Sequence, residues 1–114
     1  MALIDTRFSK PDARISEMAR RIVEKFHPDK IILFGSFARG DAGPDSDADL
    51  LVVMPTNGSR REIAVKIDMA LFGIPLPADV IVVSPQDVER GRGQIGSFLK
   101  PALTEGLVLY ERRA

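Results

Sequence analysis

The spacing of apolar residues near the start of the chain predicts an amphipathic helix. Apolar side chains recur three and four residues apart, as on one helical face, at Ile15, Met18, Ala19, Ile22, Val23 and Phe26. Ser9 is a suitable N-cap and Pro11 a suitable first-turn residue. Because proline disfavours helical geometry in the residue before it, His27-Pro28 predicts the end of the helix. We interpret His27, the only histidine, as a polar helix-end residue rather than a ligand or base.

Four short apolar runs predict the strands of a sheet. They are rich in isoleucine, leucine and valine and are bounded by glycine, proline or aspartate, as strands usually are. The runs cover residues 30–34, 47–54, 78–83 and 107–110.

Helical signals alternate with these strands. Ser59 and Glu62 form a capping box for a helix that Gly73 closes, with its apolar face at Ile63, Ile67, Ala70 and Leu71. We further expect a helical turn at 37–39, a loop at 40–46, a short helix from Ser84, a loop at 90–93 and a helix at 95–103. The element order predicts an α+β (α/β-like) fold, in which helices flank a small mixed β-sheet of about four strands.

Composition narrows the class of protein. At 114 residues we expect a single domain, residues 1–114. Sixteen basic and sixteen acidic residues balance, so we expect no direct binding of long nucleic acids. The chain has no cysteine, which excludes disulfides and thiol nucleophiles and is compatible with a cytoplasmic protein. No apolar run approaches the roughly 18 residues of a membrane span, so we expect no membrane association.

Acidic residues stand at the heads of two predicted strands. Asp47 and Asp49 are two positions apart, so on a strand they point the same way, about 7 Å apart. Asp79 opens the next strand, and if the two strands are neighbours, it comes level with that pair. Carboxylates held so close repel one another unless a cation lies between them, and a hard divalent cation prefers oxygen ligands. The pattern therefore predicts a metal site.

Two familiar binding loops do not account for these residues. Gly35 and Gly40 have the spacing of a phosphate-binding P-loop, but Asp41 stands where that loop needs lysine. Asp45, Asp47 and Asp49 also stand at positions 1, 3 and 5 of a calcium-binding EF-hand loop. However, Leu50 stands where that loop needs glycine, and Thr56 where it needs a bidentate glutamate.

The surviving pattern resembles a known superfamily. It consists of Gly-Ser-Phe-Ala-Arg-Gly at residues 35–40, Ser-Asp-Ala-Asp-Leu-Leu-Val at residues 46–52, and Asp79. It is similar to the nucleotidyltransferase superfamily that includes DNA polymerase beta. The resemblance is closest to the minimal bacterial and archaeal members, single small domains found as antitoxins beside HEPN-domain partners. By motif it covers roughly residues 30–83.

This resemblance implies transfer of a nucleoside monophosphate, AMP from ATP, to a hydroxyl, with two Mg²⁺ ions as cofactors. The implied site residues are Asp47, Asp49 and Asp79 for catalysis and metal binding, and Gly35, Ser36 and Arg39 for nucleotide binding. Arg39 has an alternative role, because it could equally pair with Asp41 or Asp45 on the surface.

The acceptor of the nucleotide is not apparent from the motif. A chain this short lacks a further domain to hold a tRNA or a primer. The resemblance implies a tyrosine or other hydroxyl on a HEPN-type toxin, with the chain acting as the antitoxin in a hetero-oligomer. The alternative is a non-catalytic binding module that neutralises or scaffolds a partner by contact. The clustered acids count against it, because carboxylates that repel one another have no evident use without a cation.

Overall fold

The computed structural model describes residues 12–91 and 105–112. The elements, in chain order, are α1 (Ala13–Phe26), β1 (Lys30–Phe34), α2 (Ser36–Arg39), β2 (Ala48–Val53), α3 (Arg60–Ala70), β3 (Ala78–Val83), α4 (Pro85–Gly91) and β4 (Leu107–Glu111). The four strands form one sheet in the order β3-β2-β1-β4. β1 is antiparallel to both β2 and β4, whereas β2 and β3 are parallel. The predicted α+β fold with a small mixed sheet is thereby confirmed.

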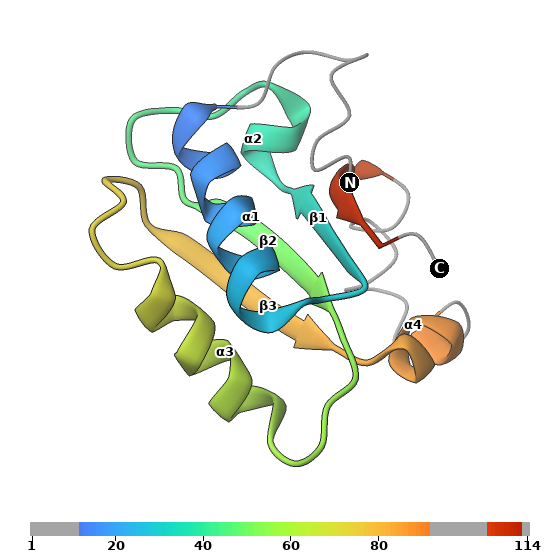
Figure 1. Cartoon of the computed structure of the whole chain (residues 1–114). Helices are drawn as coiled ribbons and strands as arrows, with labels where there is room; N and C mark the ends of the chain where they lie inside the picture. The colour runs from blue at the N-terminus through green and yellow to red at the C-terminus, as the bar shows by residue number, and fades with distance from the viewer. Residues whose placement is uncertain (1–11, 92–104, 113–114) are drawn as a thin grey trace.

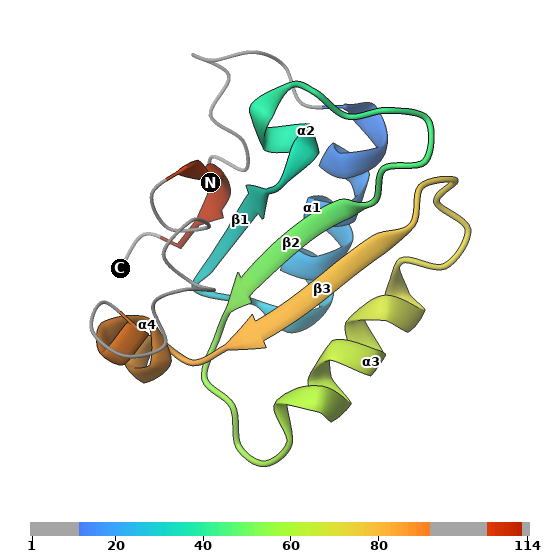
Figure 2. The same cartoon turned by 180° about the vertical axis from the view of Figure 1, so that it is seen from behind.

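The core lies between one face of the sheet and the helices α1 and α3. α1 crosses that face, and α3 lies alongside β3 (Figures 1 and 2). The predicted apolar face of α1 is fully buried here except for Phe26, which is partly buried. Ile67 of α3 and Leu71, the residue that follows this helix, join the same cluster. A second, smaller cluster on the other face contains Ile32, Leu51, Val53 and Val83, so β2 is covered on both faces.

α1 begins later than the sequence predicts. The N-cap is Asp12, whose carboxylate accepts a hydrogen bond from the backbone N–H of Arg14 at 2.8 Å. The expected cap at Ser9 was wrong for this helix, because an aspartate directly before Ala13 caps it equally well. Ser9 and Pro11 themselves lie outside the described residues. His27 ends the helix as predicted, in left-handed geometry with φ 50°, and its side chain is exposed.

Two further boundaries differ from the prediction. β2 begins at Ala48, so Asp47 precedes the strand. Residues 90 and 91 are not in a loop, because α4 continues through Gly91. A capping box starts this helix: Ser84 Oγ accepts from the N–H of Asp87, and Asp87 Oδ2 accepts from the N–H of Ser84, both at 3.0 Å. The rest of the predicted loop and the helix at 95–103 lie outside the described residues.

Arg21 joins α1 to the end of α3. Its guanidinium donates to the carbonyl oxygens of Ala70 at 3.1 Å and Phe72 at 2.9 Å, while Glu17 holds its Nε at 2.9 Å. The last carbonyls of a helix lack intrahelical donors, so this contact satisfies two groups that would otherwise need water. Arg21 thus fixes the turn that leads from α3 into β3.

Within the described ranges, none of the helices is both long enough and apolar enough to cross a membrane.

Candidate active site

The parallel pairing of β2 and β3 brings two of the predicted acids together. Asp49 is the register partner of Asp79, and Ala48 is that of Ala78. Just before the ladder, the N–H of Ala48 donates to the carbonyl of Pro77 at 2.9 Å. The expectation that the third strand lies beside the second, with Asp79 level with Asp49, is confirmed.

The antiparallel pairing of β1 and β2 brings the glycine-serine turn to the same place. Phe34 is the register partner of Asp49, so Gly35 follows directly at the end of β1. A Cβ on Gly35 would collide with the carboxylate of Asp49, and Gly35 also has φ 75°, which side chains rarely tolerate. Glycine is therefore required here on two independent grounds.

The acids influence one another electrostatically. The pKa of Asp49 is raised above its ordinary value, first by burial, then by the charge of Asp79, and then by that of Asp47. Arg39 opposes this shift, but as the smallest contribution. Asp49 is only partly exposed, whereas Asp47 and Asp79 are open to solvent. A cation at this edge of the sheet would relieve the repulsion.

The turn after β1 is tightly hydrogen-bonded. The carbonyl of Gly35 accepts from the N–H groups of Ala38 at 3.1 Å and Arg39 at 3.0 Å. The carbonyl of Ser36 accepts from Gly40 at 2.9 Å and Asp41 at 3.1 Å. These bonds form α2 and hold Ser36, partly exposed, directly beside the strand end that carries Asp49.

Arg39 points to the surface. Its Nε lies 3.3 Å from Asp41 Oδ2, and both side chains are more than half exposed. The structure therefore realises the surface pair that the sequence left open. Among the described residues, Arg39 forms no ion pair with Asp47, Asp49 or Asp79, although its charge partly lowers the pKa of Asp49.

The donor chemistry of the site fits a hard cation. Asp47, Asp49 and Asp79 offer carboxylate oxygens, which Mg²⁺ prefers. Their side chains do not form a ready-made three-ligand site, and no group of three acidic or histidine side chains elsewhere in the described ranges does so. Asp47 directly precedes β2, and its charge contributes to the raised pKa of Asp49. The residues fit the metal by type, charge and shared edge rather than by preassembled geometry.

One contact was missed by the sequence reasoning. The resemblance implied a nucleotide-binding role for Gly35, whereas its absent side chain also makes room for Asp49. The feature that reveals this contact is the antiparallel register of β1 and β2, which places Gly35 beside Asp49. The sequence motif alone does not give that register.

Comparison with known proteins identifies the family. The nucleotidyltransferase domain family matches residues 15–112. A protein of Methanocaldococcus jannaschii named "putative protein adenylyltransferase" is 34% identical over 107 residues, which cover 86% of this chain and 70% of that protein. A second protein of that organism and name is 47% identical over 38 residues, 31% of this chain and 38% of its own length.

Solved structures share the fold. A nucleotidyltransferase-like protein of Sulfolobus solfataricus superposes with a TM-score of 0.52 at 22% identity, covering 88% of this chain and 79% of its own. A mutant of the toxin–antitoxin MntA–HpeT gives a TM-score of 0.55 at 21% identity, with coverages of 89% and 73%. A toxin–antitoxin structure with AMP-PNP gives 0.54 at 23% identity, with the same coverages. The extent of the family match, together with the first M. jannaschii relative, shows that this chain belongs to the nucleotidyltransferase domain family.

Proposed function

We propose that this nucleotidyltransferase transfers AMP from ATP to a hydroxyl group on a protein, with Mg²⁺ as cofactor. The observation that carries this proposal is the meeting of Asp49 with Asp79 on one side and Gly35 on the other. The pKa of this carboxyl is raised first by burial and then by the charges of Asp79 and Asp47, so its ionised form is unfavourable without a cation, and such groups cluster at functional sites.

The comparisons support a protein as the acceptor. The M. jannaschii relative with the longer match is named for protein adenylylation. One of the toxin–antitoxin structures with the same fold is a structure with AMP-PNP, an ATP analogue, which supports a nucleoside triphosphate as the donor. Both toxin–antitoxin structures support a partner protein in the same assembly.

In this proposal each site residue has a distinct role in binding the metal, binding the nucleotide or accepting a proton. Asp47, Asp49 and Asp79 hold Mg²⁺, which when bound neutralises phosphate charge and lowers the pKa of the acceptor hydroxyl. Gly35 and Ser36 bind the triphosphate through backbone N–H and hydroxyl donors. Asp79, exposed on the edge strand, accepts the proton of the acceptor hydroxyl. The hydroxyl oxygen bonds to the α-phosphorus of ATP, the bond from that phosphorus to pyrophosphate breaks, and pyrophosphate leaves.

The acceptor in this proposal is a tyrosine of a HEPN-type toxin, and the chain is its antitoxin. This finer assignment rests on the resemblance of residues 35–52 to minimal nucleotidyltransferases and on the toxin–antitoxin structures that share the fold. Modification of the toxin and stable binding to it would then be properties of one protein.

The test uses ATP labelled at the α-phosphate. The purified chain is incubated with Mg²⁺, labelled ATP and a lysate of the source organism, beside two variants. Asp49→Asn removes the central carboxylate, whereas Asp45→Asn removes an exposed loop acid of the same type. We expect label on one protein with the native chain and Asp45→Asn, and none with Asp49→Asn. Mass spectrometry then identifies the modified residue and protein.

Other outcomes separate the alternatives. Label on RNA or on a small molecule would retain nucleotidyl transfer and contradict the protein acceptor. Absence of label, with the chain folded and the reagents active, would favour the non-catalytic binding module.

A further inference from the structure

The two faces of β3 carry different residues. Val80 and Val82 belong to the main core, on the face that α1 and α3 cover. Asp79, Ile81 and Val83 alternate with them and therefore point to the opposite face, because successive side chains of a strand point to opposite sides. On that face Ile81 and Val83 pack in the smaller apolar cluster. Asp79 and Ile81 are thus neighbours along one face of the strand.

The pairing with β2 continues this arrangement across the sheet. Asp49 is the register partner of Asp79, and Leu51 is that of Ile81. Leu51 belongs to the smaller cluster, so Asp49, two positions before it, points to the same face. A row of two carboxylates therefore lies next to a row of two apolar side chains. Leu51 is fully buried, whereas Ile81, on the edge strand, is only partly buried.

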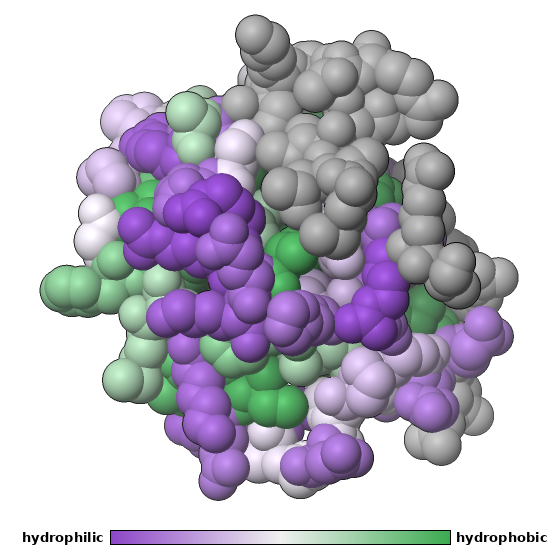
Figure 3. Space-filling model, in the orientation of Figure 1, coloured by the Kyte–Doolittle hydropathy of each residue, from purple (hydrophilic) through white to green (hydrophobic). Residues whose placement is uncertain are grey.

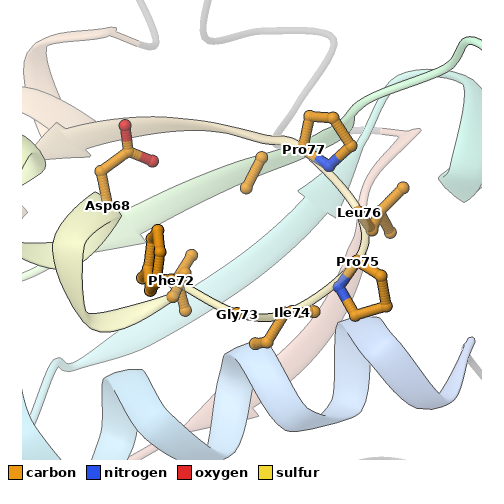
Figure 4. A pocket seen from close by; sticks show the side chains of 9 residues that line it. Asp68, Phe72, Gly73, Ile74, Pro75, Leu76 and Pro77 are labelled. Carbon is orange, nitrogen blue, oxygen red and sulfur yellow. The ribbon is translucent and has the colours of Figure 1, made fainter.

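A substrate reaches the carboxylates from the side away from α1 and α3. On the helix-covered side, hydrophilic side chains cover much of the surface over α1 (Figure 3). A groove of about 550 Å³ at the end of α3 lies on that side too, since its lining includes Leu76 of the main core and ends at Ala78 (Figure 4). Seen from behind, β2 and β3 lie in front of α1 (Figure 2). The helix that follows β3, α4, begins at the far end of that strand from Asp79.

The strand order gives the proposed reaction a direction. The triphosphate lies at Gly35 and Ser36, which follow β1, and the acceptor hydroxyl lies at Asp79 on β3, with Asp49 of β2 between them. An in-line displacement places the attacking oxygen opposite the leaving pyrophosphate. Pyrophosphate therefore leaves on the β1 side, and the acceptor approaches from the β3 side. Ile81 is the partly exposed apolar side chain on that side of the site.

We propose that Ile81 packs against the aromatic ring of an acceptor tyrosine whose hydroxyl lies at Asp79, and that it thereby selects tyrosine over serine. Ile81 is two positions, or about 7 Å, from Asp79 along the strand. A phenol ring is bonded directly to its hydroxyl and reaches this side chain, where burial of apolar surface stabilises it. A serine hydroxyl brings no ring. This role rests on the proposed transfer to a protein hydroxyl, and it adds the residue that determines which hydroxyl is used.

The first test measures the contact without transfer. The full chain is loaded with Mg²⁺ and α,β-methylene ATP, which cannot release pyrophosphate, and nuclear magnetic resonance follows the δ1 methyl group of Ile81. The probe is a capped glycine–tyrosine–glycine peptide, and the control peptide has serine in place of tyrosine. We expect the tyrosine peptide to shift the methyl signal upfield in a saturable way, through the ring current, and the serine peptide to leave it in place. No shift with the tyrosine peptide would overturn the proposal. So would an upfield shift caused by the ATP analogue alone, since Ile81 would then contact adenine.

A pair of matched variants then tests the role in transfer. Ile81→Thr keeps a β-branched side chain, which suits a strand, and makes it polar. Val80→Thr makes the same kind of change at the preceding residue, whose side chain is on the helix-covered face. We expect Ile81→Thr to raise KM for the tyrosine peptide about tenfold and to leave KM for ATP and kcat unchanged, and Val80→Thr to change none of these. Urea unfolding checks that both variants are folded. An equal rise of KM in both, or no rise in Ile81→Thr, would contradict the contact.

The choice of acceptor separates this role from the proposed function. The native chain should transfer AMP to the tyrosine peptide with a kcat/KM at least about tenfold above that for the serine peptide, and Ile81→Thr should lose most of this preference. A methyl shift of Ile81 without transfer to either peptide would contradict the proposed function alone. Transfer to tyrosine with a preference that Ile81→Thr leaves intact would contradict the role of Ile81 alone.

Discussion

The carboxylate of Asp49 occupies the space that a side chain on Gly35 would need. This contact joins the end of β1 to the start of β2, and the parallel pairing with β3 adds Asp79 on the opposite side. The geometry of the candidate site therefore depends on backbone register in two strand pairs rather than on the glycine-serine turn alone.

Substitution of Gly35 should cost more stability than the same substitution at a comparable glycine. Gly35 and Gly40 both have positive φ, 75° and 85°, but a Cβ on Gly40 would meet nothing within 4 Å. We expect Gly40→Ala to lose about 1 kcal/mol from backbone strain, and Gly35→Ala to lose roughly 1–3 kcal/mol beyond that. The extra loss has two causes, because Asp49 must move and because Gly35, with ψ −153°, has a backbone conformation that only glycine adopts readily, whereas Gly40 is in the left-handed helical region. Urea unfolding measures both. Equal losses would mean that the contact with Asp49 relaxes without cost.

Asp49 should destabilise the ligand-free protein at neutral pH. A carboxyl whose pKa is raised in the folded state holds its proton more tightly when folded, so stability is lost as the pH rises from the ordinary value of 3.8 through the raised pKa. Asp49→Asn removes this loss. We expect the free energy of unfolding of the variant to exceed that of the native chain at pH 7, with the difference shrinking as the pH falls toward 3.8. Urea unfolding across this range tests the sign, and a variant that is less stable at pH 7 would contradict the repulsion.

Mg²⁺ and a non-hydrolysable ATP analogue should together raise the melting temperature. A ligand that binds only the folded chain, at about a hundred times its Kd, adds about 2.7 kcal/mol, or about 10 °C for a domain of this size. Differential scanning fluorimetry should detect this shift in the native chain and in Asp45→Asn. Asp49→Asn should lose most of it, and a full shift in that variant would remove Asp49 from the metal and nucleotide site.

Arg21 should stabilise the fold far more than its neighbour Arg20. Arg21 donates to the carbonyls of Ala70 and Phe72, whereas Arg20 pairs only with Glu17 and Glu24 on its own helix. We expect Arg21→Ala to lose about 1–3 kcal/mol, because two carbonyls at the end of α3 lose their donor. Arg20→Ala should stay within about 0.5 kcal/mol, since exposed ion pairs contribute little. Similar losses in both variants would show that water replaces the Arg21 contact.

Much of the fold could be predicted because local patterns and burial agree. The apolar face of α1 follows helical spacing and is buried almost throughout. β3 was predicted with its observed bounds, and the idea that Asp79 would meet Asp49 needed only the assumption that β2 and β3 are neighbours. The first residue of α1 was harder to predict, because Ser9 and Asp12 are comparable N-caps and the local sequence does not distinguish between them.

The site could be predicted less completely, because it depends on contacts between distant segments. The second strand was predicted to begin at Asp47, whereas β2 begins one residue later, at Ala48. From the sequence, Arg39 could equally bind the triphosphate or pair with Asp41. In the structure it forms an ion pair with Asp41. The space that Gly35 leaves for Asp49 follows from strand register, which a linear pattern does not contain.

The connection between α2 and β2 is stabilised by its own turn. The N–H of Gly43 donates to Ser46 Oγ at 2.8 Å, and the N–H of Ser46 donates to the carbonyl oxygen of Gly43 at 3.1 Å. The position of Asp49, by contrast, is fixed by the strands on either side of β2. Insertions beside Pro44 should therefore be tolerated, since doubling a loop costs only about 0.6 kcal/mol. This loop offers evolution, or an engineer, a place to add residues beside the site while the carboxylates stay where they are.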